Sequence, residues 1–148
     1  VWYTQRCIAK MNIYSKILNI LMLSGKKFKA EKILKDTFRI LNDKYNKDPS
    51  ATFSKSVNNV RPLFEIRSVR IAGRTQQIPF PLKKEKQLAL ALKWLVSSAR
   101  SSNRGTFSEK LAFEIHEASL GKGMAIKKRD DLHKVAESSR AFAHFRWC

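Results

Sequence analysis

The side chains best placed to do chemistry in this sequence are lysines and arginines, and the chemistry they offer is the binding of anions. Thirty Lys and Arg residues stand against twelve Asp and Glu, which gives a net charge of +18 in 148 residues. A folded domain with that charge repels itself, so a polyanionic partner would stabilise it. Nucleic acid is the first candidate partner, and an anionic membrane surface is the second.

One basic cluster lies in the stretch RSVRIAGRTQQIPFP, residues 67–81. Apolar and polar residues alternate in it around a glycine, a pattern typical of a β-hairpin. Arg67, Arg70 and Arg74 crowd the predicted tip, and we expect no acid close to them. Because like charges gain nothing from being crowded in a free hairpin, these arginines indicate contact with a polyanion.

A regular stripe of cations follows the hairpin. Lys86, Lys93 and Arg100 recur every seven residues, which places them on one side of a helix. The apolar residues on the opposite side are Leu88, Leu92, Leu95 and Ala99. A charged stripe often faces only water, but solvated helices usually interleave Glu with Lys, and only Glu85 is available here. The stripe therefore favours a phosphate-binding surface.

Further basic clusters lie near predicted helix ends. They are Lys26-Lys27 with Lys29, Lys83-Lys84, and Lys127-Lys128-Arg129. At a loop-to-helix junction, free backbone N–H groups and the helix dipole already favour phosphate. Cations at such junctions strengthen an anion site.

The C-terminal segment AFAHFRWC interleaves aromatic and basic residues. Aromatic rings and guanidinium planes stack on unpaired bases, which suits RNA loops better than the grooves of DNA. We expect Phe142 and Phe145 to close the core. Arg146 and Trp147 are expected to remain exposed as contacts.

Catalytic and metal-binding patterns are missing from the sequence. It contains no GxxxxGK[ST], GxGxxG, HExxH or GxSxG motif. His116, His133 and His144 have no metal-ligand spacing to one another or to cysteine. Glu114 and Glu117 flank His116, and we interpret them as ordinary positions on an exposed helix face. We therefore expect no enzyme, no cofactor and no metal.

The cysteines and the N-terminal residues bear on the cellular compartment. Cys7 and Cys148 lie near opposite ends, which indicates reduced thiols rather than a disulfide framework or zinc site. No run reaches the ~18 consecutive apolar residues of a membrane span. Residues 1–30 contain no acid, as in organelle transit peptides, although a folded first helix with basic flanks is the favoured interpretation.

The elements that must position these residues are mostly helical by their apolar spacing. Helices are expected at about 13–23, 28–45, 49–61, 85–101, 107–120 and 129–143, and strands at about 63–71 and 75–82. Pro79 and Pro81, spaced by two, point their missing N–H groups the same way, so the second strand is predicted to be an edge. A two-stranded ribbon is marginally stable alone, so we expect it to pack against something.

The predicted fold is mainly α. It is a six-helix domain with a protruding two-stranded β-hairpin between the third and fourth helices. Residues 1–148 are expected to form one domain, with an N-terminal extension at 1–11, the hairpin at 63–82 and a C-terminal tail at 142–148.

Four segments of the sequence resemble one protein family. They are GKKFKAEKIL, NVRPLFEIRSVRIAGRTQQIPF, LALALKWLV and GKGMAIKKRDDLHKVAESSRAFAHFRW, in this order. Together they span roughly residues 12–147 and resemble the S-seven family of small-subunit ribosomal proteins, in its bacterial and organellar form. The sequence differs from the family pattern at Ala72-Gly73, where two glycines are usual, and at Gln76, where tyrosine is usual.

The resemblance implies a structural protein that binds the 3′ major domain of small-subunit ribosomal RNA, organises the subunit head, and lies near the tRNA exit site and the mRNA path. The expected rRNA contacts, which include Lys93 and Arg100 from the helix stripe, are Lys26, Lys27, Arg67, Arg70, Lys83, Lys84, Lys86, Lys93, Arg100, Lys127, Lys128 and Arg129. The residues expected toward the exit site are Arg74, Gln77, Arg146 and Trp147. The implied partners are neighbouring head proteins and, transiently, tRNA and mRNA, with no membrane and no homo-oligomer.

Location and rival functions remain open at this point. Frequent Lys, Asn, Ile and Phe and the acid-free start favour a mitochondrial ribosome, with a plastid or bacterial ribosome as alternatives. A DNA-binding regulator would place the fourth helix in a major groove, where Gln87 is the candidate for reading bases, and would be expected to dimerise. A basic membrane-surface protein is the third hypothesis.

Overall fold

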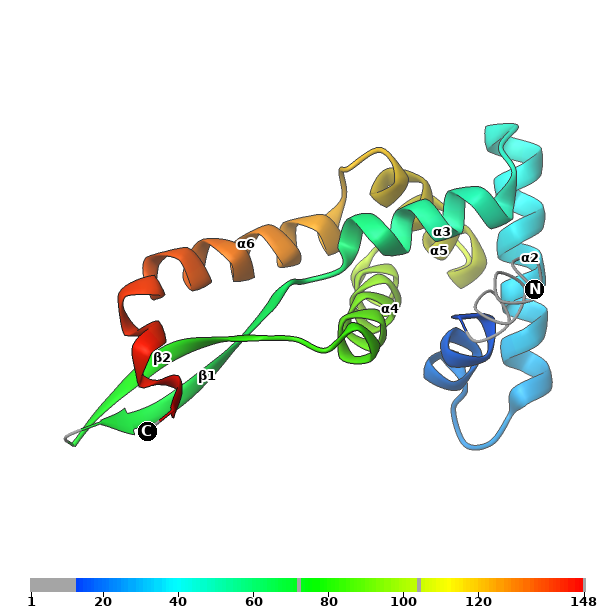
Figure 1. The fold of residues 1–148 in the computed structure, drawn as a ribbon. Coiled ribbons are helices and arrows are strands. Elements are labelled where there is room, and N and C mark those ends of the chain that lie inside the picture. The colour runs from blue at the N-terminus through cyan, green and yellow to red at the C-terminus, as the bar shows by residue number, and fades with distance from the viewer. Residues whose placement is uncertain (1–12, 72, 104, 148) are drawn as a thin grey trace, which may run out of the picture.

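The computed structural model describes residues 13–71, 73–103 and 105–147 (Figure 1). Within these ranges, residues 13–21 form a first helix. The helices that follow are α2 (Lys27–Tyr45), α3 (Pro49–Val60), α4 (Lys84–Ser101), α5 (Phe107–Ser119), α6 (Met124–Ser138) and the 3-10 helix η1 (Arg140–Trp147). The strands β1 (Phe64–Ile71) and β2 (Arg74–Pro81) lie between α3 and α4. The expected mainly α fold with one hairpin is therefore confirmed.

Some sequence expectations concern residues outside the described ranges. These are the extension at 1–11, both cysteines and Ala72 of the predicted turn. The side chains of Arg146 and Trp147 are likewise outside the description, although their backbone belongs to η1.

The hydrophobic core forms where the apolar faces of the helices meet. Leu92, Leu95 and Ala99 of α4 are fully buried, as the helical spacing predicts. Phe53 of α3 is also buried, and its ring lies 5.9 Å from that of Phe38 on α2. This core holds α4 with its cationic stripe turned outward.

The two strands form an antiparallel ribbon whose register runs from Phe64 opposite Pro81 to Ile71 opposite Arg74. Leu82 N–H donates to the carbonyl of Leu63 at 3.1 Å, just beyond the last ladder pair. Because hydrogen-bonded pairs alternate in an antiparallel ladder, Pro79 and Pro81 occupy positions without ladder bonds. Their missing N–H groups therefore cost the ribbon nothing.

The support that the ribbon was expected to need comes, at its base, from the same chain. Figure 1 shows α6 running beside the ribbon and η1 folding back onto it, and β1 contacts α6 while β2 contacts η1. Leu63 N–H donates to Nε2 of His133 on α6 at 3.2 Å. Ile78 on β2 is fully buried. The ribbon thus rests on the C-terminal helices rather than standing free.

The start of α6 differs from the expected start near residue 129. Gly123 is the N-cap residue, with φ of 100°, and the carboxylate of Glu114 on α5 accepts the N–H of Ala125 at 2.8 Å. Glu114 is only 4% exposed, so the interpretation of an exposed position was wrong. A buried carboxylate from α5 satisfies an N-terminal amide of α6, which lets the helix begin without a capping side chain of its own.

The C-terminal aromatics also differ from expectation. The long sixth helix ends at Ser138, and the chain continues as η1. Phe142 and Phe145 lie on η1 and are half-buried, away from the main core of the helical body. They belong to the C-terminal support of the ribbon.

Candidate nucleic-acid interface

The cationic stripe of α4 lies on the surface as predicted. Lys86, Lys93 and Arg100 are all exposed, on the side of the helix away from its buried leucines. Lys128 of α6 joins them, because its Nζ donates to Oγ of Ser97 on α4 at 3.0 Å. A cation from a distant part of the chain thus extends the stripe, and Ser97, which no sequence pattern singled out, is the residue that connects them.

Two shallow grooves follow each other along this stripe, and Ile20 and Lys93 line both of them. One, of about 500 Å³, lies between the first helix and α4, and Ile20, Lys93 and Arg100 line it. The other, of about 320 Å³, reaches the ribbon base at Glu65 and is also lined by Lys86 and Lys93. The stripe cations thus line both depressions, a shape that can accept a polynucleotide backbone. Together with Lys128 they are called the cationic ridge below.

The cations of the stripe have no acidic partner among the described residues. The ion pairs in these ranges are Arg39–Asp43, Lys44–Glu109, Arg67–Glu65 and Arg129–Asp130. None of them includes Lys86, Lys93, Arg100 or Lys128. Exposed ion pairs contribute little stability, but an unpaired cationic surface attracts phosphate strongly at low salt.

Two of the basic junctions lie where they were predicted. Lys26 and Lys83 are the N-cap residues of α2 and α4, and neither helix has a side-chain cap there. Lys27 and Lys84, which follow them, are exposed. The starts of both helices, which have no side-chain cap, thus lie beside cations, an arrangement that favours anion binding.

The third junction cluster is not at a junction. Because α6 begins at Met124, residues 127–129 lie one turn inside it. The Arg129 guanidinium donates to both Asp130 Oδ1 and the Asn59 carbonyl. Arg129 therefore ties α6 to the end of α3, in addition to any role at the surface.

The three arginines of the ribbon have different environments. The expectation of no nearby acid is wrong for Arg67, whose Nε lies 2.5 Å from Glu65 Oε1 and whose guanidinium lies 4.9 Å from the centre of the Phe80 ring. Arg70 and Arg74 lie nearer the tip and are exposed. Since side chains alternate across a ribbon, Arg67 and Arg74 share one face while Arg70 lies on the other.

Two histidines serve the packing of the helices. His116 stacks on Tyr45 with ring centres 4.0 Å apart, and burial followed by the nearby Lys47 lowers its pKa. Burial also lowers the pKa of His133, helped by Arg129, which suits its role as hydrogen-bond acceptor for the ribbon.

Over the ranges that the structure describes, no three His, Cys, Asp or Glu side chains gather as metal ligands, and no helix is long and apolar enough to cross a membrane.

Comparison with known proteins decides the family. The family model described as ribosomal protein S7p/S5e matches residues 3–140. The chain belongs to the S7p/S5e family. It is thus a ribosomal protein that takes part in translation, as the sequence resemblance indicated. The match begins within the segment 1–11 and ends before the tail at 142–148.

Relatives of this S7p/S5e protein have closely similar lengths. The small ribosomal subunit protein uS7 of Kosmotoga olearia is 44% identical over 135 residues, which cover 91% of this chain and 87% of the relative. The proteins of the same name from Lactobacillus acidophilus and Metamycoplasma arthritidis are each 47% identical, over 91% of this chain and 86% of theirs.

Proposed function

We propose that this protein is a structural constituent of the small ribosomal subunit, where it binds the 3′ major domain of the ribosomal RNA and organises the subunit head. The unpaired cationic ridge formed by Lys86, Lys93, Arg100 and Lys128 carries this proposal. In this role the protein neutralises phosphates and holds RNA helices in one arrangement. It makes and breaks no covalent bond.

The proposed contacts follow from position and charge. The rRNA-binding residues are Lys26, Lys27, Arg67, Arg70, Lys83, Lys84, Lys86, Lys93, Arg100, Lys127, Lys128 and Arg129. Residues proposed near the tRNA exit site and mRNA path are Arg74, Gln77, Arg146 and Trp147. A-form major grooves admit few side chains, so phosphate, sugar and shape should dominate recognition. Arg67 and Arg129 are held by protein acids, so the ridge should contribute more of the affinity.

The alternative function, in which α4 is a DNA-recognition helix, depended on Gln87 as the residue that reads bases. Gln87 is half-buried, and its Nε2 donates to the carbonyl of Leu82 at 2.9 Å. A side chain occupied in this way at the helix start is poorly placed to read a base edge.

The proposed partners are neighbouring head proteins and, transiently, tRNA and mRNA, in a mitochondrial ribosome. The acid-free residues 1–30 support the mitochondrial assignment, while plastid and bacterial ribosomes are the alternatives. Sedimentation of organelle and whole-cell lysates on gradients tests both points. The protein should travel with small ribosomal subunits from mitochondria, and a wholly free pool would contradict the proposal.

A binding titration tests the ridge itself. The triple variant with Lys86, Lys93 and Arg100 changed to Ala should bind a 3′ major-domain RNA fragment more weakly at 50 mM salt. It should also lower the slope of log affinity against log salt by about 2–3, because each lost phosphate contact removes roughly one unit. The control variant changes Arg39, Lys44 and Lys55 to Ala, which removes the same charge elsewhere on the surface. Equal effects of both variants would refute a specific ridge.

A further inference from the structure

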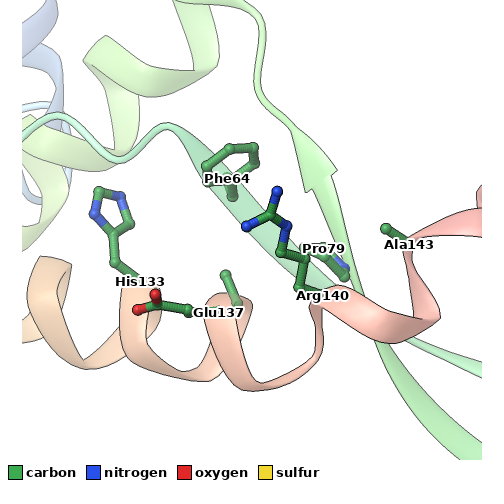
Figure 2. Close-up of a pocket in the computed structure, with 7 residues that line it drawn as sticks. Phe64, Pro79, His133, Glu137, Arg140 and Ala143 are labelled. Carbon is green, nitrogen blue, oxygen red and sulfur yellow. The ribbon is translucent and has the colours of Figure 1, made fainter.

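A cavity of about 480 Å³ opens where the ribbon base meets the C-terminal helices (Figure 2). Its apolar walls include Phe64 of β1, Pro79 of β2 and Ala136 of α6. The charged side chains that line it are Glu137 of α6 and Arg140 of η1. None of these residues belongs to the cationic ridge on α4.

Phe64 presents a fixed aromatic ring to this cavity. The side chain is 38% exposed, so part of its ring surface is open to a ligand. Its ring meets the His133 ring edge-to-face, with centres 6.4 Å apart and planes at 71°. His133 in turn accepts the N–H of Leu63, so the Phe64 ring packs against an anchored side chain while part of its surface stays exposed.

Arg140 extends into the same cavity. Figure 2 shows its side chain rising from η1 toward the Phe64 ring. An aromatic ring and a guanidinium plane are the two protein groups that stack on unpaired RNA bases. Together with the apolar residues that line the cavity, they could contact both faces and edges of a planar heterocycle.

Glu137 provides the means of choosing between bases. Its carboxylate is exposed and takes no ion-pair partner within the described ranges. A carboxylate is an acceptor with two oxygens, so it can receive two parallel N–H donors. Guanine carries two adjacent donors, N1–H and N2–H, on its Watson–Crick edge, whereas adenine, cytosine and uracil have no two adjacent donors there.

We propose that this cavity binds one unpaired guanine of an RNA. The base stacks on the Phe64 ring and the Arg140 guanidinium, and its N1–H and N2–H donate to the Glu137 carboxylate. The inference rests on the proposed RNA-binding function and adds a base-specific site to a surface that otherwise contacts phosphate. A net charge of +18 draws RNA to this protein, and an apolar peptide would leave the carboxylate unused, so a base is favoured over a peptide as the occupant.

Fluorescence anisotropy with labelled RNA heptamers tests this site in the full-length chain. UUUGUUU should bind about tenfold more tightly than UUUAUUU or UUUUUUU, through stacking and the paired donors. Glu137→Gln should abolish the preference for guanine while the affinity for UUUUUUU stays unchanged or rises slightly. Phe64→Leu should weaken UUUGUUU about tenfold.

The control is Asp131→Asn, which removes a negative charge from an exposed position of the same helix outside the cavity. It should keep the preference for guanine. Equal binding of the three RNAs by the wild-type protein, or a preference that survives Glu137→Gln, would overturn the guanine site and leave the phosphate-binding ridge intact. Binding of none of the three at low salt would overturn the proposed function as well.

Discussion

Replacing Gly123 by alanine tests the way α6 begins. Gly123 has φ of 100° and ψ of 171°, and a Cβ added there would lie 3.2 Å from both Glu114 Oε1 and Glu117 Cβ. The substitution therefore strains the backbone and pushes the Glu114 carboxylate away from the Ala125 N–H.

The expected loss of stability has two parts. The backbone region that Gly123 occupies is essentially reserved for glycine and costs other residues ~1–3 kcal/mol. Displacing the Glu114 carboxylate by a few tenths of an ångström weakens, without removing, a hydrogen bond that would be worth ~1.5–3 kcal/mol if it were lost completely. Gly123→Ala should thus lower the free energy of unfolding by about 2–4 kcal/mol, out of the ~5–15 kcal/mol typical of a domain.

Urea unfolding followed by far-UV circular dichroism measures this loss. With a slope of ~1–3 kcal/mol per molar urea, the midpoint should fall by about 1–2 M. Gly121→Ala is the matched control, because Gly121 also has positive φ, 78°, but an added Cβ there would meet nothing within 4 Å. The control should lose only ~1–2 kcal/mol from left-handed backbone strain. If Gly123→Ala loses no more than Gly121→Ala, the tertiary cap by Glu114 does not contribute as argued.

Two further predictions concern the ribbon base and the core. Burial and the nearby Arg129 lower the folded-state pKa of His133 below the ordinary 6.5, and Asp130 partly opposes this shift. The stability that this group contributes is present above about pH 6.5 and is lost as the pH falls. Protection of the Leu63 amide against hydrogen exchange should therefore drop in acid. Constant protection down to pH 5 would contradict the role of His133 as acceptor. Leu92→Asp buries an unpaired charge at a fully buried position, so it should lower the free energy of unfolding by more than about 4 kcal/mol and unfold the domain. Ala89→Asp, at an exposed position of the same helix, should change the stability little. If Leu92→Asp kept the circular dichroism spectrum and the gel-filtration elution volume of the wild-type protein, the assignment of Leu92 to the buried face of α4 would be wrong.

Local patterns in the sequence determined most of the secondary structure and one part of the candidate site. Apolar residues at helical spacing identified the buried face of α4, and the seven-residue spacing of Lys86, Lys93 and Arg100 placed these cations on the opposite surface. The spacing of Pro79 and Pro81 predicted a ribbon with unbonded positions, which the register confirms. These features depend on the repeat of a single element, so neighbouring residues are sufficient to specify them.

Packing between distant segments decided the rest. The start of α6 depends on Glu114 from α5, and the support of the ribbon depends on Leu63 meeting His133 seventy residues later. The extension of the ridge likewise required Lys128 to reach Ser97 on another helix. Each of these is a hydrogen bond whose partner is fixed by how whole helices pack. No periodicity within one segment carries that information, and only the folded chain brings the donor and acceptor within about 3 Å of each other.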